Sequence, residues 1–252
     1  MMPAGVLTPQ LSCAALVDEV VADLTGQFPK AKVVGCAADV TSEDSLCALA
    51  AYGKQHLGGI DIWINNAGVT QTDKTPVHKT PESVLRAVVD TNLVGTLLGC
   101  KVAINAMLEE PQRKGHVFNM DGAGANGMST PNFAVYGATK AALPQLMKSL
   151  VKETAGTNVG IHTLSPGMVL TDLLMSGNRE PRVLKVFNIL AERPRTVAQW
   201  LVPRIRAASG SGRYIKFLTA VGAAWRFATF FRRKNRFFDA QGVLKHEPPL
   251  RQ

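Results

Sequence analysis

Tyr136 and Lys140 lie four residues apart, shortly after Pro131, at the end of the stretch N-M-D-G-A-G-A-N-G-M-S-T-P-N-F-A-V-Y-G-A-T-K. On a helix this spacing places a phenol and an ammonium on one face, one turn apart. A phenol has a pKa of about 10, and a fixed cation beside it lowers that pKa. Such a pair can give a proton to a carbonyl oxygen while hydride reaches the carbon. A surface helix with an i, i+4 pair is the alternative explanation.

Three apolar segments predict strands that would position this helix. Ile60 to Gly68 reads I-D-I-W-I-N-N-A-G, which predicts a buried parallel strand followed by a tight turn. Gly115 to Met120 predicts the strand that leads into the Tyr136 segment. Ile161 to Thr171 reads I-H-T-L-S-P-G-M-V-L-T and predicts a short strand ended by Pro166-Gly167. Two of these segments look like strand ends beside a ligand.

The remaining periodic segments predict three helices and a further strand. Ala14 to Phe28 has apolar residues at a period near 3.6, which favours an amphipathic helix. Lys32 to Val40 predicts a strand. Thr41 to His56 predicts a helix with its N-cap at Thr41 or Ser42. Pro81 to Met107 predicts a long helix that carries Asn92.

Composition favours one α/β domain. The chain has 252 residues, of which 46% are hydrophobic and 19% are charged, as is ordinary for a globular protein. Residues 1–10 contain no Arg or Lys, so neither a signal peptide nor an Arg-rich transit peptide is predicted there. No metal site is predicted, because the four cysteines have no C-x-x-C spacing: Cys13, Cys36, Cys47 and Cys100.

The ordered motifs resemble those of the short-chain dehydrogenase/reductase superfamily. Members carry N-N-A-G, an Asn on the fourth helix, Y-x-x-x-K and P-G-x-x-x-T in this order, as does this chain. The resemblance implies a Rossmann-like doubly wound parallel sheet and an NADPH cofactor, with NADH as the other possibility. It also implies that Tyr136 is the proton donor, that Lys140 lowers its pKa and holds the ribose, and that Asn92 binds a water of the proton relay.

The residues implied to contact the cofactor are Asp39, Val40, Asn65, Ala67, Gly68, Tyr136, Lys140, Pro166, Gly167 and Thr171.

Two features depart from the superfamily pattern. The 252 residues contain no T-G-x-x-x-G-x-G turn, so we expect an N-terminally truncated sheet that lacks its first two strands and binds NADPH weakly. An incomplete gene model or fragment is the leading explanation. The family's catalytic Ser lies about thirteen residues before the Tyr, where this chain has Ala123. Either Ser129 orients the carbonyl through a different loop, or polarisation of the carbonyl is weakened.

A narrower resemblance covers roughly Lys32 to Leu244. The tracts N-M-D-G-A-G, V-Y-G-A-T-K, S-P-G-M-V-L-T-D-L-L and F-F-D-A-Q-G look like the chlorophyll(ide) b reductases of plants and green algae. This implies NADPH-dependent reduction of the formyl group of chlorophyll b or chlorophyllide b to hydroxymethyl, on the stromal side of the thylakoid. A generic reductase of lipophilic aldehydes or ketones is one alternative. A non-catalytic subunit that assembles with a homologous reductase is the other.

The C-terminal part holds the excess of positive charge. We predict a single domain over residues 1–252, with a cofactor and catalytic core at 32–175 and a substrate-binding part at 176–245. From Arg193 to Phe238 there are eleven basic residues and no acids, in a chain whose net charge is +9. Phe217 to Phe231 is too short to span a bilayer, so it predicts an interfacial helix or a hydrophobic lid. Contact with anionic lipid fits best, and a solvated basic face is the alternative. A nucleic-acid surface is not predicted, because no binding module is present.

Overall fold

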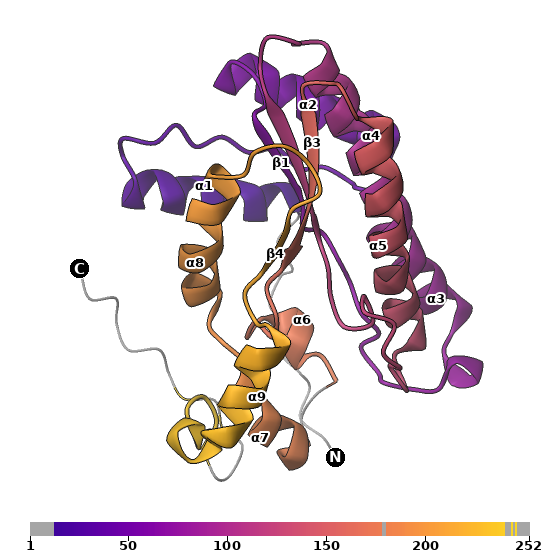
Figure 1. The fold of residues 1–252 in the computed structure, drawn as a ribbon, viewed down its shortest axis with the longest axis vertical. Coiled ribbons are helices and arrows are strands. Elements are labelled where there is room, and N and C mark those ends of the chain that lie inside the picture. The colour runs from indigo at the N-terminus through magenta and orange to yellow at the C-terminus, as the bar shows by residue number, and fades with distance from the viewer. Residues whose placement is uncertain (1–12, 178–179, 240–242, 244, 246–252) are drawn as a thin grey trace, which may run out of the picture.

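A four-stranded parallel sheet forms the centre of the computed structural model, which describes residues 13–177, 180–239, 243 and 245. The strands follow the order β1-β2-β3-β4. Their bounds are Ile62–Asn65, Gly115–Met120, Val159–Ser165 and Tyr214–Lys216. Because the strands are parallel, their carboxyl ends meet at one edge, where α6 and α9 lie in Figure 1.

The helices are α1 (Cys13–Gln27), α2 (Glu43–Leu57), α3 (Glu82–Val89), α4 (Gly95–Leu108), α5 (Ala134–Glu153), α6 (Asp172–Met175), α7 (Pro181–Leu190), α8 (Pro194–Arg206) and α9 (Ala220–Ala228), with 3₁₀ turns η1 (Val77–Lys79) and η3 (Phe230–Arg233) and a π turn η2 (Asp90–Val94).

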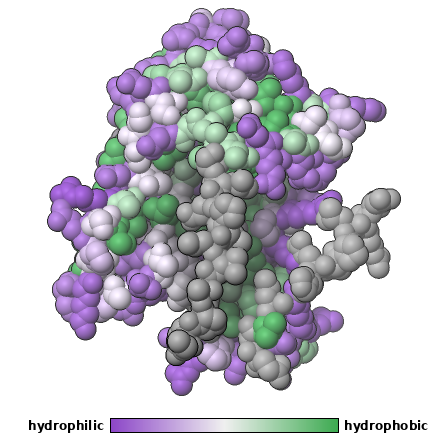
Figure 2. Space-filling view, turned by 180° about the vertical axis from the view of Figure 1, so that it is seen from behind, coloured by the Kyte–Doolittle hydropathy of each residue, from purple (hydrophilic) through white to green (hydrophobic). Residues whose placement is uncertain are grey.

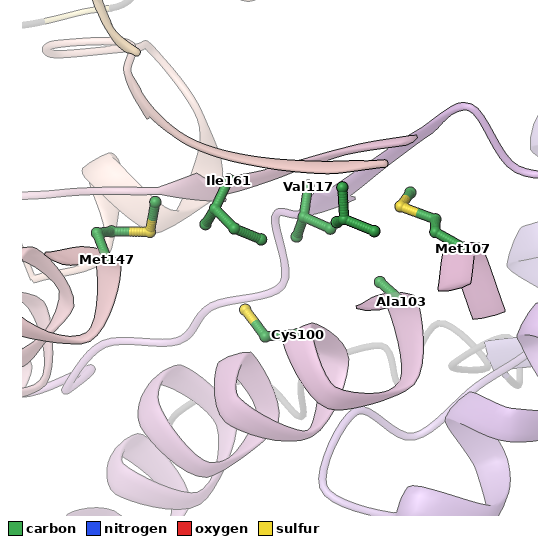
Figure 3. Packing of buried hydrophobic residues seen from close by; sticks show 7 residues of the cluster. Cys100, Ala103, Met107, Val117, Met147 and Ile161 are labelled. Atoms are coloured by element: carbon green, nitrogen blue, oxygen red, sulfur yellow. The ribbon is translucent and has the colours of Figure 1, made fainter. Parts of the chain in front are cut away.

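Helices cover both faces of the sheet. On one face, α4 and α5 pack Cys100, Ala103 and Met147 against Val117 and Ile161 of β2 and β3 (Figure 3). On the other face, α8 buries an apolar stripe formed by Val197, Leu201 and Ile205 against Phe118 and Leu164. Strand residues that alternate between the two faces thus supply both layers of the core, as the period of two in a strand requires.

The predicted helices form where the sequence placed them. The α1 helix confirms the prediction over Ala14 to Phe28. The α2 helix begins after Ser42, whose hydroxyl accepts a hydrogen bond from the Ser45 backbone at 3.3 Å. Of the two predicted N-caps, the structure therefore uses Ser42.

The long helix predicted from Pro81 is confirmed as a continuous run from Glu82 to Leu108. In the described part of the chain this run is long and apolar enough to cross a membrane by length and composition alone. Its α4 half packs against α2 and against the sheet instead. The π turn at Asp90–Val94 interrupts its regular pattern and carries Asn92, and such turns often mark functional sites.

The strand predicted over Lys32 to Val40 is wrong, because no strand is present there in the described structure. A strand forms only when its backbone groups pair with a neighbour. Among the described strands β1 pairs only with β2, so the segment before α2 has no partner strand.

β1 is parallel as predicted, but it is not buried. Ile62 and Ile64 are 38% and 43% exposed, because β1 lies at the edge of the described sheet. Figure 2, the view from behind, shows hydrophobic residues at the surface among hydrophilic ones.

Pro144 does not end its helix. The α5 helix continues from Ala134 to Glu153 through Pro144, although proline removes one backbone donor and crowds the preceding turn. Lys140 keeps its place on the first half of this helix, ahead of the proline.

The histidine pair between β2 and β3 predicts acid sensitivity. His116 Nδ1 lies 2.9 Å from His162 Nε2, and burial together with nearby His116 and Arg213 lowers the pKa of His162 to about 4. Burial also lowers the pKa of His116. The unfolded chain therefore binds more protons than the fold below about pH 6.5, so stability falls as the pH drops from there toward 4. We expect the free energy of unfolding to fall on the order of 1 kcal/mol between pH 7 and pH 5.

Urea unfolding across this pH range measures the effect. In a His162→Gln variant the pH dependence should flatten. An equally steep decline in that variant would assign the acid sensitivity to other groups.

Candidate active site

Tyr136 and Lys140 both lie at the carboxyl end of β2, on the first turns of α5. The Tyr136 hydroxyl is so close to Gly122 that a Cβ at position 122 would lie 2.3 Å from it. The Lys140 Nζ donates a hydrogen bond to the Met120 carbonyl oxygen at 3.0 Å. The helical spacing read from the sequence thus brings both side chains to the end of one strand.

Asp121 forms a second polar cluster at the same place. Its backbone N–H donates to the Leu164 carbonyl at 2.9 Å, which fixes β2 against β3. Its carboxylate accepts a hydrogen bond of 2.5 Å from the Tyr214 hydroxyl of β4. Burial raises the pKa of Asp121, and Tyr214 and Ser165 oppose that rise by hydrogen bonding to the carboxylate. Residues from three neighbouring strands, β2, β3 and β4, therefore meet at one buried carboxylate.

The electrostatic effect on Tyr136 differs from the one expected from its spacing to Lys140. Burial raises the pKa of Tyr136 to about 12, and the charge of Asp121 adds to the rise. The Lys140 ammonium lies 5.8 Å from the centre of the Tyr136 ring and is directed at Met120. Burial lowers the pKa of Lys140 itself, and Asp121 opposes this shift. Burial and Asp121 thus both favour the protonated phenol of Tyr136.

Asn92 is buried in the π turn and holds the loop that follows β1. Its Oδ1 accepts from the Val69 N–H at 2.8 Å, and its Nδ2 donates to the Val69 carbonyl at 2.9 Å. The same Nδ2 lies 3.4 Å from Thr139 Oγ1, which donates to the Tyr136 carbonyl at 2.7 Å. A polar path therefore joins the loop after β1 to the backbone of Tyr136.

Among the described residues, no hydrogen bond links Ser129 to Tyr136. Ser129 is exposed in the loop between β2 and α5. The next residue, Thr130, lies against the helix instead: a Cβ at Gly137 would be 2.0 Å from Thr130 Oγ1. The role of Ser129 stays a prediction.

Several residues predicted to contact a cofactor surround one hollow beside β1. A cavity of about 340 Å³ is lined by Val40, Asn65, Ala67 and other residues, including Asn66 and Thr91. Asp39 lies next to this wall and accepts hydrogen bonds from the Thr41 backbone and hydroxyl at 2.9 and 2.7 Å. These bonds hold the pKa of Asp39 below its usual range.

Asn65 also has a structural contact across the sheet. Its Nδ2 donates to Asn119 Oδ1 of β2 at 2.7 Å, and its Oδ1 accepts from Trp63 Nε1 at 2.7 Å. Gly68 follows Ala67 of this wall, and a Cβ at Gly68 would be 3.4 Å from Asn92 Oδ1. The contacts of both residues with a cofactor stay predictions.

The Pro166-Gly167 turn follows β3 as the sequence predicted. Gly167 has φ +72, a conformation that favours glycine, and a Cβ there would lie 2.7 Å from Leu218 Cβ. Thr171 is the N-cap of α6, where its hydroxyl accepts from the Leu174 N–H at 3.4 Å. Both residues lie beyond the carboxyl end of β3.

Sequence reasoning missed the partners of Asp121. Tyr214 stands in the basic C-terminal segment and Ser165 in the strand predicted over Ile161 to Thr171, and neither belongs to one of the ordered motifs. A usable signal was the short segment Tyr214–Lys216, since a fourth strand that pairs in parallel with β3 brings Tyr214 close to the residue that follows β2.

The parallel sheet, the covering helices and the Tyr–Lys pair at the strand ends define a class of protein. The chain belongs to the short chain dehydrogenase family, whose model matches residues 10–182. Solved structures share this fold. The short-chain type dehydrogenase/reductase of Mycobacterium marinum aligns with a TM-score of 0.69 and 22% identity over 82% of each chain. The 3-ketoacyl-(acyl-carrier-protein) reductase of Brucella melitensis, solved with NADH, aligns with a TM-score of 0.67 and 20% identity over 80% of this chain and 82% of that one.

Two plant proteins are similar in sequence. The chain is 48% identical over 212 residues to the probable chlorophyll(ide) b reductase NYC1, chloroplastic, of Oryza sativa subsp. japonica, which covers 84% of this chain and 42% of the relative. It is 42% identical over 234 residues to the chlorophyll(ide) b reductase NOL, chloroplastic, of the same species, covering 89% of this chain and 68% of that relative. The chain thus spans less than half the length of the first relative.

The contact between Gly122 and Tyr136 gives a prediction that needs no assay of activity. Gly122→Ala places a methyl group against the Tyr136 hydroxyl, so we expect a loss of about 1–3 kcal/mol in the free energy of unfolding. Combining Gly122→Ala with Tyr136→Phe removes the clashing oxygen and should recover most of this loss. Denaturant unfolding of the two single variants and the double variant measures the coupling.

Gly26→Ala on α1 is the matched control, because nothing lies within 4 Å of a Cβ at that position. Equal losses in the single and double variants would show that the hydroxyl is not the obstacle.

Proposed function

We propose that this chain reduces the formyl group of chlorophyll b or chlorophyllide b to a hydroxymethyl group with NADPH. The observation that carries the proposal is the Tyr136–Lys140 pair at the end of β2 in a chain 48% identical to a probable chlorophyll(ide) b reductase. Relatives named as reductases of this pigment match 84% and 89% of the chain. These relatives supply the substrate class of the proposal, a chlorophyll pigment.

The hollow beside β1 fits a nicotinamide cofactor. Its wall combines the amide of Asn66 and the hydroxyl of Thr91 with apolar Val40, polar and apolar groups suited to a ribose and an adenine. When bound, NADPH supplies the hydride that reaches the formyl carbon and becomes NADP⁺. The preference for NADPH over NADH is part of the proposal and is supported by the resemblance to the reductases.

The proton for the formyl oxygen comes from Tyr136 in this proposal. A phenol held protonated by burial and by Asp121 is in the form that a reduction requires. Lys140, anchored on the Met120 carbonyl, orients the end of β2 and restores charge balance when Tyr136 loses its proton. Asn92 holds the relay water in this proposal, supported by its polar path to the Tyr136 backbone through Thr139.

Place and partners follow from the relatives and from the C-terminal part. The similar plant proteins are named chloroplastic, which supports a chloroplast location for this chain. We place it on the stromal face of the thylakoid membrane, where an apolar pigment lies. The exposed aromatic residues Trp225, Phe230 and Phe231 support membrane contact through α9 and η3.

Turnover of chlorophyllide b by the purified chain tests the proposal. The assay uses the 252-residue chain and, in parallel, the same chain joined to the N-terminal region of its rice relative. Loss of the formyl absorbance with NADPH in the joined protein would support the reductase. Reduction of simple lipophilic aldehydes without the pigment would favour a generic reductase. No turnover in either form would favour a non-catalytic partner of a homologous reductase.

Tyr136→Phe removes the proposed proton donor and leaves the ring in place. We expect turnover to fall by at least about 10²-fold while the dissociation constant for NADPH changes little. Cofactor titration and turnover are measured on the same preparation. Tyr52→Phe, on the α2 helix, is the control and should keep full turnover. A Tyr136→Phe variant with more than about a tenth of normal turnover would rule out the donor role.

Asp121→Asn tests the electrostatic link to Tyr136. A carboxylate beside a phenol disfavours the phenolate, so its removal lowers the pKa of Tyr136. The proton donor is then lost at a lower pH, and the alkaline limb of kcat/KM should move to lower pH. Asp61→Asn, a surface carboxylate paired with Arg113, is the control and should leave the limb in place. An unmoved limb in Asp121→Asn would mean that Asp121 does not act on the donor.

A further inference from the structure

Three arginines of the C-terminal segment converge on one buried carboxylate. Arg233 Nη2 lies 2.6 Å from Glu192 Oε1, Arg236 Nη2 lies 2.9 Å from Oε2, and Arg226 Nη2 lies 3.3 Å from Oε1. The Glu192 side chain is only 9% exposed, and its backbone pairs with Met168 and Leu170 beyond β3. Glu192 therefore fixes the cationic segment to the body of the fold.

Two of these arginines are held by further bonds. Arg233 Nε donates to the Ile189 carbonyl at 2.6 Å, and Arg226 Nη1 donates to the Leu190 carbonyl at 2.7 Å. Both carbonyls belong to the last turn of α7. The guanidinium groups thus have fixed positions before any ligand arrives, which lowers the entropy lost on binding.

The same arginines line a cavity of about 380 Å³. Its wall is formed by Gly222, Trp225, Arg226, Thr229, Arg232, Arg233 and Arg236. Four arginines line it, and Glu192 is the only carboxylate among their described ion-pair partners. Burial lowers the pKa of Arg226, and the nearby charges of Arg233 and Arg236 add to this effect while Glu192 opposes it. A second anion in the cavity would relieve the repulsion.

The chemistry of the wall selects an oxyanion. Guanidinium groups bind phosphate and carboxylate through pairs of parallel hydrogen bonds. Trp225 adds an indole face to this wall, and the Thr229 hydroxyl, which donates to the Trp225 carbonyl at 2.7 Å, holds the end of α9. A phosphate group is small enough for this volume, and its negative charge balances the excess of arginines over carboxylates at the site.

The surroundings point to a lipid headgroup as the source of that phosphate. Val221 is 81% exposed, Trp225 68% and Phe231 66%, and all three lie on α9 or η3 beside the cavity. In Figure 1 these elements form one end of the molecule, next to α7 and away from α2. Exposed aromatic residues next to cationic ones are typical of surfaces that enter the membrane interface.

We propose that the cavity formed by Arg226, Arg232, Arg233 and Arg236 binds the phosphate group of an anionic lipid headgroup, with the aromatic residues of α9 and η3 in the bilayer interface. This proposal names the ligand for the membrane contact of the proposed function. It rests on the proposed membrane location and not on the proposed reductase activity. The binding site is specific, whereas a diffuse basic surface would respond to any lost charge equally.

Two pairs of substitutions separate these cases. Arg232→Gln with Arg236→Gln removes two charges from the cavity wall. Arg195→Gln with Arg206→Gln removes two exposed charges from α8, outside that wall. Flotation with phosphatidylcholine vesicles, with and without phosphatidylglycerol, measures binding of the 252-residue chain over a salt series. Circular dichroism shows whether each variant is folded.

For binding to the phosphatidylglycerol vesicles we expect at least about a tenfold loss in the cavity variant and less than about a threefold loss in the α8 variant. Inorganic phosphate should displace the unsubstituted chain more strongly than chloride at equal ionic strength. Arg232→Gln alone, at a residue that joins none of the described ion pairs of Glu192, should weaken binding without a change in stability.

Equal losses in the two double variants, or equal binding to both kinds of vesicle, would overturn the proposal. Strong binding of inorganic phosphate together with no binding to phosphatidylglycerol vesicles would overturn the lipid as the source. Pigment reduction is measured separately, in detergent. A failure of vesicle binding therefore does not count against the proposed reductase activity, which the turnover assay tests.

Discussion

The site depends on the close approach of the β2–α5 loop to the first turns of α5. Gly122 allows the Tyr136 hydroxyl to lie where any Cβ would stand. One turn further along, Lys140 spans the same gap to reach the Met120 carbonyl. A side chain at position 122 would push α5 away from the strand end and separate both groups from Asp121. The geometry of the reacting groups is thus set by the absence of an atom as much as by the residues present.

That approach places a phenol, an ammonium and a carboxylate in one poorly solvated space. Burial disfavours every charged form there, so it raises the pKa values of Tyr136 and Asp121 and lowers that of Lys140. The Tyr214 hydroxyl donates to Asp121 and so supports its charged form. A carboxylate stabilised in this way keeps the neighbouring phenol protonated. The cluster therefore keeps a proton on Tyr136, and the reduction of a carbonyl group requires such a proton donor.

Local patterns in the sequence were sufficient for much of this arrangement. The i, i+4 spacing placed Tyr136 and Lys140 on one face of α5, and the apolar runs located β1, β2 and β3. Lys32 to Val40 has the same apolar character but forms no strand, because pairing depends on a neighbour that local sequence does not reveal. Tyr214 was missed for a related reason: its contact with Asp121 joins residues 93 positions apart and exists only because β4 lies beside β3. The pKa of Tyr136 was expected to fall, but it is raised. The sequence shows the spacing from Tyr136 to Lys140, whereas it does not show that Tyr136 is buried and faces the Asp121 carboxylate.

By charge alone the C-terminal part is one basic segment, but in the structure its arginines form two groups with different contacts. Arg204 lies over the Trp200 ring at 3.7 Å on α8 and serves that helix's surface. Arg226, Arg233 and Arg236 instead surround Glu192, the acid that directly precedes the segment counted as free of acids. One buried carboxylate cannot neutralise three guanidinium groups, yet it can order them, because each is drawn to the same two oxygens. Ordering without neutralisation leaves fixed positive charges around an open volume, and this combination distinguishes a binding site from a solvated basic face.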